Sequence, residues 1–245
     1  MFSSLDISIG FLLMALLAEV VGTIGGFGSS VFFVPMAGFY LDFHSVLGLT
    51  ALLHVASNAS KLALFRKGLD RKLIVYIGVP SVIFVILGGW LTQYIDTGAL
   101  KIVLAIFLIA FSLFFLIRKN IVIQPNKTNA AAGGIFSGFS AGLLGTGGAI
   151  RGLTMASFNL EKSVFVATSA FIDLLIDTTR TVVYYQNGYI KKEEWVYVPF
   201  LLAVAIVGSY IGKKILERMP QHYFRRFSLV LILLIGTLML FQIDA

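Results

Sequence analysis

Charged side chains inside apolar stretches are the first candidates for chemistry in this 245-residue chain. Three cations and three carboxylates lie there: Lys61, Arg151, Arg180, Glu19, Asp173 and Asp177. A charge in apolar surroundings is costly to bury, so each is a functional candidate with an expected partner. The chain has no cysteine, no Gly-x-Ser-Gly and no paired His-x-x-x-His, so an intramembrane enzyme is the least favoured function.

Arg151 follows a glycine-rich break, and this pattern predicts an anion site. The break reads Gly145-Thr146-Gly147-Gly148. A helix that restarts after it presents free N–H groups and a positive dipole end, which favour an anion. A guanidinium adds charge and a planar fork suited to oxyanions. The alternative is a structural arginine, paired with Glu19 or Asp177.

A second glycine cluster, Gly25, Gly26 and Gly28, is expected to form the opposite wall of that site. Ser29 follows it and can offer a hydroxyl, although a serine at such a place can also serve helix packing. Asn58 is also a candidate ligand. The predicted substrate-binding residues are Gly25, Gly26, Gly28, Ser29, Asn58, Gly145, Thr146, Gly147, Gly148 and Arg151.

Proton coupling has four candidates: Glu19, His54, Asp173 and Asp177. Asp173, Asp177 and Arg180 are spaced i, i+4, i+7 and share one helix face. Asp177 and Arg180 can neutralise each other, which makes Asp173 the better candidate.

The other candidates leave alternatives open. His54 titrates near neutral pH, but it can equally be a packing histidine. Glu19 is either a proton acceptor or a partner of Arg151. Lys61 lies five residues before Arg66, so we expect its side chain to extend to the membrane interface.

Composition indicates a helical membrane protein that positions these residues. The chain is 58% hydrophobic and 13% charged, with mean hydropathy +0.92, which a soluble domain cannot solvate. A crossing needs about 20 apolar residues. Eight apolar segments are predicted at about 7–39, 45–65, 73–92, 99–117, 129–158, 163–186, 195–212 and 224–243. The net charge of +7 lies in the linkers between them, so no nucleic-acid partner is expected.

The two halves of the chain, 1–120 and 121–245, match each other. Gly22–Gly28 aligns with Gly142–Gly148, and Ser45 and Thr50 align with Ser163 and Thr168. We predict a duplicated unit of four segments. The first segment of each unit is about 30 residues long with central glycines, so a pair of half-helices is expected there.

Lys and Arg in the linkers predict the topology. If the two broken segments return to their own side, 13 of these residues face one side and 3 the other. This satisfies the positive-inside rule and gives the repeats opposite orientations, with both termini non-cytoplasmic. Inverted repeats with broken helices are typical of secondary transporters. The predicted fold is therefore all-α and polytopic, with two inverted-topology repeats, each a glycine-broken segment plus three transmembrane helices.

The chain resembles the TauE/SafE family of membrane proteins over nearly its whole length. The resemblance rests on Gly25–Ser30 followed by Val34-Pro35, on Gly145–Gly148, on Gly48-Leu49-Thr50 and on Ala167-Thr168-Ser169. The second half departs from the family pattern, since it has Leu153-Thr154-Met155 in place of Val-Pro and carries Arg151 there. The resemblance implies export of sulfite or an organosulfonate across the bacterial inner membrane.

The favoured function is thus secondary transport of a small anion by alternating access, in which one half of the protein rocks against the other. Protons are the candidate coupling ion. A cation or metal transporter on the same fold is the alternative. The expected partners are the anion and the lipid bilayer, and a homo-oligomer is compatible with the sequence. No cofactor and no protein-bound metal are expected.

Overall fold

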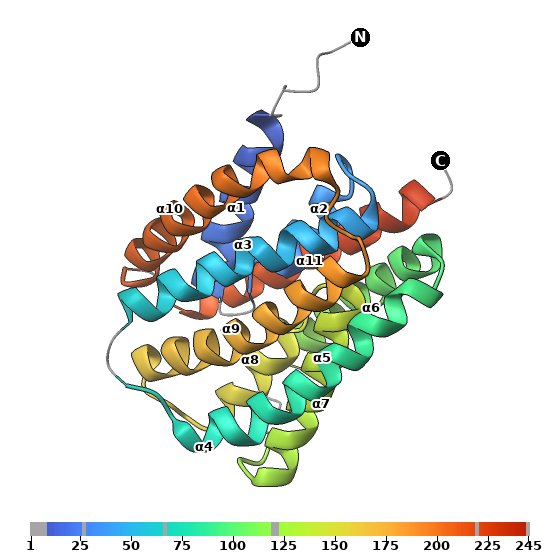
Figure 1. Ribbon diagram of the computed structural model, residues 1–245. Coiled ribbons are helices and arrows are strands. Elements are labelled where there is room, and N and C mark those ends of the chain that lie inside the picture. The colour runs from blue at the N-terminus through green and yellow to red at the C-terminus, as the bar shows by residue number, and fades with distance from the viewer. Residues whose placement is uncertain (1–8, 26–27, 66–67, 119–122, 219–220, 244–245) are drawn as a thin grey trace.

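The computed structural model describes residues 9–25, 28–65, 68–118, 123–218 and 221–243, and every regular element in these ranges is helical (Figure 1). The first half of the chain contains α1 (Ile9–Gly25), α2 (Ser30–Ala37), α3 (Phe43–Leu64), α4 (Arg71–Leu73), the π-helical turn η1 (Ile74–Gly78), α5 (Val79–Leu91), the 3₁₀ turn η2 (Thr92–Tyr94) and α6 (Thr97–Ile117). The second half contains α7 (Lys127–Leu144), α8 (Gly148–Ala156), α9 (Lys162–Gln186), the 3₁₀ turn η3 (Lys192–Tyr197), α10 (Val198–Leu216) and α11 (Gln221–Ile243). The all-helical prediction is confirmed.

Apolar surface marks the protein as a multi-pass membrane protein. Three described stretches are long and apolar enough to cross a bilayer: Arg71–Tyr94, Thr97–Ile117 and Lys192–Leu216. The shorter apolar stretches Ile9–Ile24 and Leu229–Phe241 add to these. Large apolar side chains such as Ile9, Ile117 and Phe241 point outward, where lipid rather than water would cover them.

Short polar side chains begin several of the helices and explain where the linkers end. Asp42, Asp70, Asp96 and Asn126 each accept a hydrogen bond from the backbone N–H three residues later, at 2.8 to 3.1 Å. Such N-caps satisfy N–H groups that the first helical turn leaves free. The linkers between the predicted segments therefore contain the N-cap residues at which several of the helices begin.

The first long apolar segment is a hairpin of two half-helices. α1 ends at Gly25, and α2 begins at Ser30. α2 runs back along α1, because the backbone of Ser29 packs directly on Gly22, while the Tyr40 ring, just beyond α2, lies 5.8 Å from the Phe11 ring near the start of α1. A side chain at position 22 would collide with the returning backbone.

The second long segment repeats this hairpin. α7 ends at Leu144 and is followed by Gly145, whose φ of 73° is left-handed and suits glycine. α8 then returns along α7, because the backbone carbonyl of Gly147 accepts a hydrogen bond from Ser137 and the Thr154 side chain packs on Gly133. The predicted half-helices are thus present in both halves, and each pair folds back on itself.

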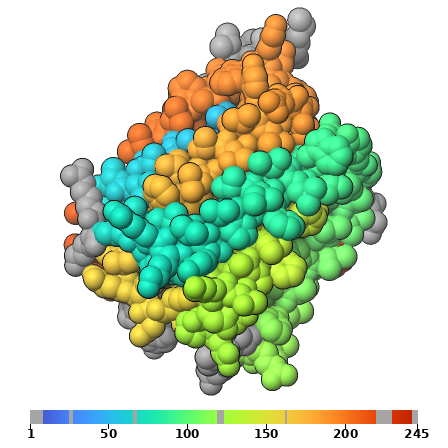
Figure 2. All heavy atoms as spheres, turned by 60° about the horizontal axis from the view of Figure 1, so that its bottom comes forward, coloured from blue at the N-terminus to red at the C-terminus, as the bar shows by residue number. Residues whose placement is uncertain are grey.

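Helices from the two halves are interleaved in the packing. α1 packs mainly on α10, and the corresponding helix of the second half, α7, packs mainly on α5. α3 packs on α9, and α6 packs on α11. Figure 2 shows the turquoise α5 between the gold α9 and the yellow-green α7, although α5 belongs to the first half.

Two hydrophobic cores follow from this interleaving. The smaller core joins α5, α7, α8 and α9 through residues such as Val85, Ala141, Met155 and Ile176. The larger core joins mainly α1, α2, α3, α6, α10 and α11, with Phe33, Leu49 and Ile232 among its members, and it also includes Leu144, Ala149 and Tyr184 from α7, α8 and α9. Buried polar contacts join the two groups of helices, such as those of Ser30 with Thr146 and of Asn58 with Asp177.

The linkers gather at two opposite ends of the molecule. At one end, Lys213 Nζ donates to the Leu64 carbonyl, and the backbone N–H of Asp70 donates to the Thr168 hydroxyl. At the other end, Lys191 Nζ lies 2.5 Å from Asp42. Burial tends to raise the pKa of Asp42, but hydrogen bonds from Lys191 and Ser45 outweigh it and lower that pKa to about 2. The Asp42–Lys191 ion pair is therefore charged at neutral pH.

Close contact between α5 and α7 predicts a strict requirement for glycine at position 138. A Cβ added there would lie 2.2 Å from the Ser81 carbonyl oxygen, so Gly138→Ala must separate the two backbones. We expect a loss of about 1–3 kcal/mol in the free energy of unfolding, measured in detergent.

The matched control is Gly78→Ala, whose Cβ would meet Ile172 at an ordinary 3.6 Å. This variant should be as stable as the parent or slightly more stable. Equal destabilisation of both variants would show that backbone contact between α5 and α7 is not the cause.

Candidate functional site

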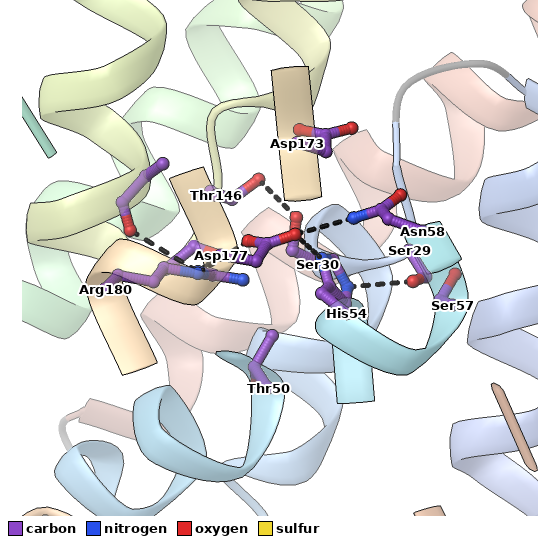
Figure 3. A network of polar contacts seen from close by, with 12 residues as sticks. Ser29, Ser30, Thr50, His54, Ser57, Asn58, Thr146, Asp173, Asp177 and Arg180 are labelled. Atoms are coloured by element: carbon purple, nitrogen blue, oxygen red, sulfur yellow. Dashed lines mark hydrogen bonds and ion pairs between the residues drawn. The ribbon is translucent and has the colours of Figure 1, made fainter. Parts of the chain in front are cut away.

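The two glycine breaks touch each other at the centre of the helix bundle. The Ser30 hydroxyl lies 3.3 Å from the Thr146 hydroxyl, which Figure 3 shows as a direct contact. A Cβ built on Gly28 would lie 3.8 Å from the Cα atom of Gly148. The beginnings of α2 and α8 therefore converge, as predicted from the two clusters. Gly25 is the last residue of α1, and Gly26 lies outside the described residues.

Carbonyl oxygens of the second break already accept hydrogen bonds from neighbouring helices. The Gly145 carbonyl accepts from Arg180 at 2.8 Å, the Thr146 carbonyl from Ser140 at 2.5 Å and the Gly147 carbonyl from Ser137 at 2.9 Å. These bonds stabilise non-helical backbone that water does not reach. Consequently these carbonyls are directed toward α7 and α9.

Arg151 is in the first turn of α8 and is only 2% exposed. Its Nε donates to the Ser169 hydroxyl at 3.2 Å, and its Nη1 forms an ion pair with Asp173. Both partners are on α9. The alternative partners expected for Arg151, Glu19 and Asp177, are therefore wrong, because each of them is held by another cation.

Asp177 forms the centre of the contacts drawn in Figure 3. It pairs with Arg180 at 2.8 Å, accepts a hydrogen bond from Asn58 at 2.7 Å, and lies 3.7 Å from His54 Nδ1. The predicted intrahelical pair with Arg180 is confirmed. Asn58 and His54 come from α3, so Asp177 also joins α9 to α3.

Glu19 is fully buried on α1 within a shell of hydroxyl groups. It accepts hydrogen bonds from Thr23 at 3.1 Å, Ser29 at 2.6 Å and Ser209 at 3.0 Å, and a further one from Ser57. The Ser29 hydroxyl also contacts His54 Nε2 at 2.9 Å. Glu19 therefore joins the first break to α3 and α10.

Lys61 is the cation that neutralises Glu19, and the expectation that it reaches the membrane interface is wrong. Its Nζ lies 3.0 Å from Glu19 and 2.7 Å from the Ser57 hydroxyl, and the residue is 8% exposed. A buried carboxylate nearby holds the ammonium inside, because leaving Glu19 unpaired would cost more than lysine gains in water. Lys61 is therefore one of the residues around the site.

Two small cavities border the Arg151–Asp173 pair. One is lined by residues of both breaks together with His54, Asp177 and Arg180. The other is lined by Thr23, Asn58, Lys61, Phe165, Ser169 and neighbouring residues. Gly28, Arg151 and Asp173 line both cavities, so this ion pair stands between them. Each cavity has room for at most a few water molecules.

Several hydroxyl-bearing residues of the site were missed from the sequence. Ser57, Ser209 and Ser169 bind charged side chains, and Ser137 and Ser140 bind the carbonyls of the second break. Ser137 and Ser140 do have a sequence signal, since they lie three residues apart just before the break. The others have no such signal, because the carboxylate and the arginine that they bind are 18 or more positions away in the sequence. Among the described residues, no group of three or more His, Asp or Glu side chains could hold a metal ion.

Comparison with known proteins agrees with this architecture. The profile of the sulfite exporter TauE/SafE family matches residues 11–239. The chain belongs to the TauE/SafE family. It is also 26% identical over 238 residues to a probable membrane transporter protein of Methanocaldococcus jannaschii, covering 86% of this chain and 87% of that one. As a TauE/SafE protein, the chain is a membrane transporter.

The pairing of Lys61 with Glu19 predicts strong energetic coupling between them. Lys61→Met leaves a buried carboxylate without its cation and should lower the free energy of unfolding by about 3–5 kcal/mol. The double variant Glu19→Gln/Lys61→Met removes both charges and should recover much of this loss. A double-mutant cycle by denaturation in detergent measures the coupling, and additive losses would contradict the pairing.

Proposed function

We propose that this protein is a secondary transporter that moves a small anion, sulfite or an organosulfonate, and that Arg151 is the central binding residue. The observation that carries the proposal is a buried arginine beside the meeting point of two helix N-termini. Free N–H groups and dipoles at the beginnings of α2 and α8 favour negative charge there. The guanidinium of Arg151 supplies a full positive charge and directional donors for sulfur-bound oxygens.

Backbone geometry supports an anion over the alternative cation. Transporters that bind cations at broken helices use carbonyl oxygens that the break sets free. Here the carbonyls of Gly145, Thr146 and Gly147 already accept hydrogen bonds from protein side chains. A cation at this break would have to displace those bonds and approach Arg151, whereas an anion would do neither.

Substrate binding requires the structure to open. The two cavities beside Arg151 are smaller than a sulfite ion with its contacts, and Ser30 and Thr146 hold the breaks together. We infer that the structure represents a closed state of the transport cycle. Separation of the two breaks would enlarge the cavities and expose Arg151.

Alternating access is supported by the interleaved packing. The largest helix contacts come in corresponding pairs, as for α1 on α10 and α7 on α5, or α10 on α3 and α5 on α9, which is the pattern of two related repeats. The smaller hydrophobic core favours α5 with α7, α8 and α9 as one moving body, rather than either sequence half. The larger core meets this body through Leu144, Ala149 and Tyr184, which would have to slide during the motion. Motion of this body against the remaining helices would open the site alternately at either end.

Orientation in the membrane follows from the linkers. Both hairpins return to the end where they start, which is the arrangement that places 13 linker cations on one side and 3 on the other. We infer inverted repeats, a cytoplasmic basic end near Leu64 and Lys213, and non-cytoplasmic termini, in a cell membrane that carries the positive-inside bias.

Arg151 variants test the binding residue. In proteoliposomes, Arg151→Ala should reduce the flux of sulfite and methanesulfonate by about 30-fold or more, because a buried charge contact to the anion is lost. Arg151→Lys keeps the charge but loses the fork, so an intermediate flux is expected. The matched control is Arg118→Ala, an exposed arginine at the end of α6, which should not change the flux.

Unchanged sulfite flux in Arg151→Ala would show that the site is elsewhere. A parent protein that moves neither anion, but carries a divalent metal ion in the same vesicles, would instead favour the cation transporter.

Cross-linking tests alternating access at the end where Asp42 pairs with Lys191. The chain has no cysteine, so the double variant Asp42→Cys/Lys191→Cys places one thiol at the beginning of α3 and the other in the linker that joins α9 to α10. A short bismaleimide should stop anion flux in this variant and leave both single-cysteine variants active. Full flux in the cross-linked protein would contradict opening at this end.

A further inference from the structure

We propose that Asp173 is the exchangeable counter-ion of Arg151: the transported anion displaces it, and it then takes up one proton. This inference rests on the proposed function and deepens it by naming the coupling ion and the residue that carries it. The sequence left four candidates for this role, and the contacts of the three buried carboxylates separate them.

Glu19 and Asp177 are held too firmly to exchange. Glu19 has no exposed side-chain surface and is bound by Lys61 and four hydroxyl groups. Asp177 has 4% exposure and is bound by Arg180 and Asn58. Releasing either carboxylate would break several buried hydrogen bonds at once and leave their donors unpaired.

Of the three buried carboxylates, Asp173 is bound by the fewest side chains. Its side chain is 16% exposed, and Arg151 is the partner that the structure gives it. No dashed line joins Asp173 to another drawn residue in Figure 3, in contrast to Asp177. Asp173 also lines both cavities, so a carboxylate released from Arg151 has space to turn into.

Competition for one cation is the physical basis of the exchange. Arg151 holds Asp173 as it would hold a substrate, through a guanidinium–oxyanion contact. A sulfonate that approaches through either cavity meets the same guanidinium. The guanidinium carries a single positive charge, so it can neutralise only one of the two oxyanions, although its remaining N–H groups can donate hydrogen bonds to both.

Charge balance then requires a proton. The interior holds Lys61, Arg151 and Arg180 against Glu19, Asp173 and Asp177, so three positive charges face three negative ones. A bound monoanion adds one negative charge, and a displaced buried carboxylate without a cation is strongly unfavourable. One proton taken up by Asp173 restores the balance, so anion and proton bind together at a ratio of one to one.

Other groups near Asp173 do not take this role. The titratable or charged side chains that line a cavity together with Asp173 are Arg151 from α8, His54 and Lys61 from α3, and Asp177 and Arg180 from α9 itself. Among the other elements packed against α9, η1 carries Tyr76 and α7 carries Lys127, while His44 of α3 is stacked on Tyr189. The cations among them repel a proton, and Lys127 lies over the Tyr76 ring. His54 contacts Ser29 and Asp177 rather than Arg151, so anion binding does not release it from a partner.

Calorimetry on the full chain in detergent tests the proposal. Methanesulfonate is titrated in buffers of different ionisation enthalpy, which counts the protons taken up per anion; this anion has no proton of its own to exchange near neutral pH. The parent should take up one proton per anion, with affinity falling about tenfold per pH unit in alkaline solution. Asp173→Asn should take up none, bind about tenfold more tightly or better, and show no pH dependence.

Three further variants keep the outcomes distinct. Asp177→Asn should still take up one proton, which separates the proposed role from a general effect of removing a carboxylate. Asp173→Ser serves as the second variant if Asp173→Asn does not fold. Arg151→Ala should lose anion binding, and if it binds normally the proposed function fails. Proton uptake that persists in both Asp173 variants, with anion binding intact, would overturn the role of Asp173. The proposed anion transport would not be affected by this result.

Discussion

Backbone that leaves the helical conformation inside a membrane must find its hydrogen-bond partners within the protein, since no water is available there. This constraint governs the centre of the molecule. Ser137, Ser140 and Arg180 satisfy the carbonyls of the second break, and the first break packs against it through Ser30 and Thr146. Both hairpins must therefore meet deep inside the bundle, with α7 and α9 beside them to supply donors.

Buried charges obey a similar constraint, and the protein meets it with pairs that connect different helices. Lys61 on α3 neutralises Glu19 on α1, and Arg151 on α8 is paired with Asp173 on α9. Such pairs position the half-helices, and the contacts of Asp177 with Asn58 and His54 join the two groups of helices. The residues that hold the closed state together are consequently the ones that a substrate or a moving bundle would have to rearrange.

Much of the fold could be predicted because it depends on local patterns. Apolar length gave the eight segments, and glycine clusters gave the two breaks. Partners across helices could not be predicted so well. The i, i+3 spacing was enough to pair Asp177 with Arg180, but the partners of Arg151 and Lys61 depend on how α8 meets α9 and α1 meets α3. Lys61 illustrates the limit, because its distance from Arg66 suggested an interface while Glu19, 42 positions earlier, holds it inside.

A structure of the protein with bound selenite, a heavier analogue of sulfite, tests the central claim most directly. The account predicts density between the two glycine breaks, within hydrogen-bonding distance of the Arg151 guanidinium, with the beginnings of α2 and α8 on either side. Density at another place, with Arg151 still paired to Asp173 and the two breaks still in contact, would contradict it.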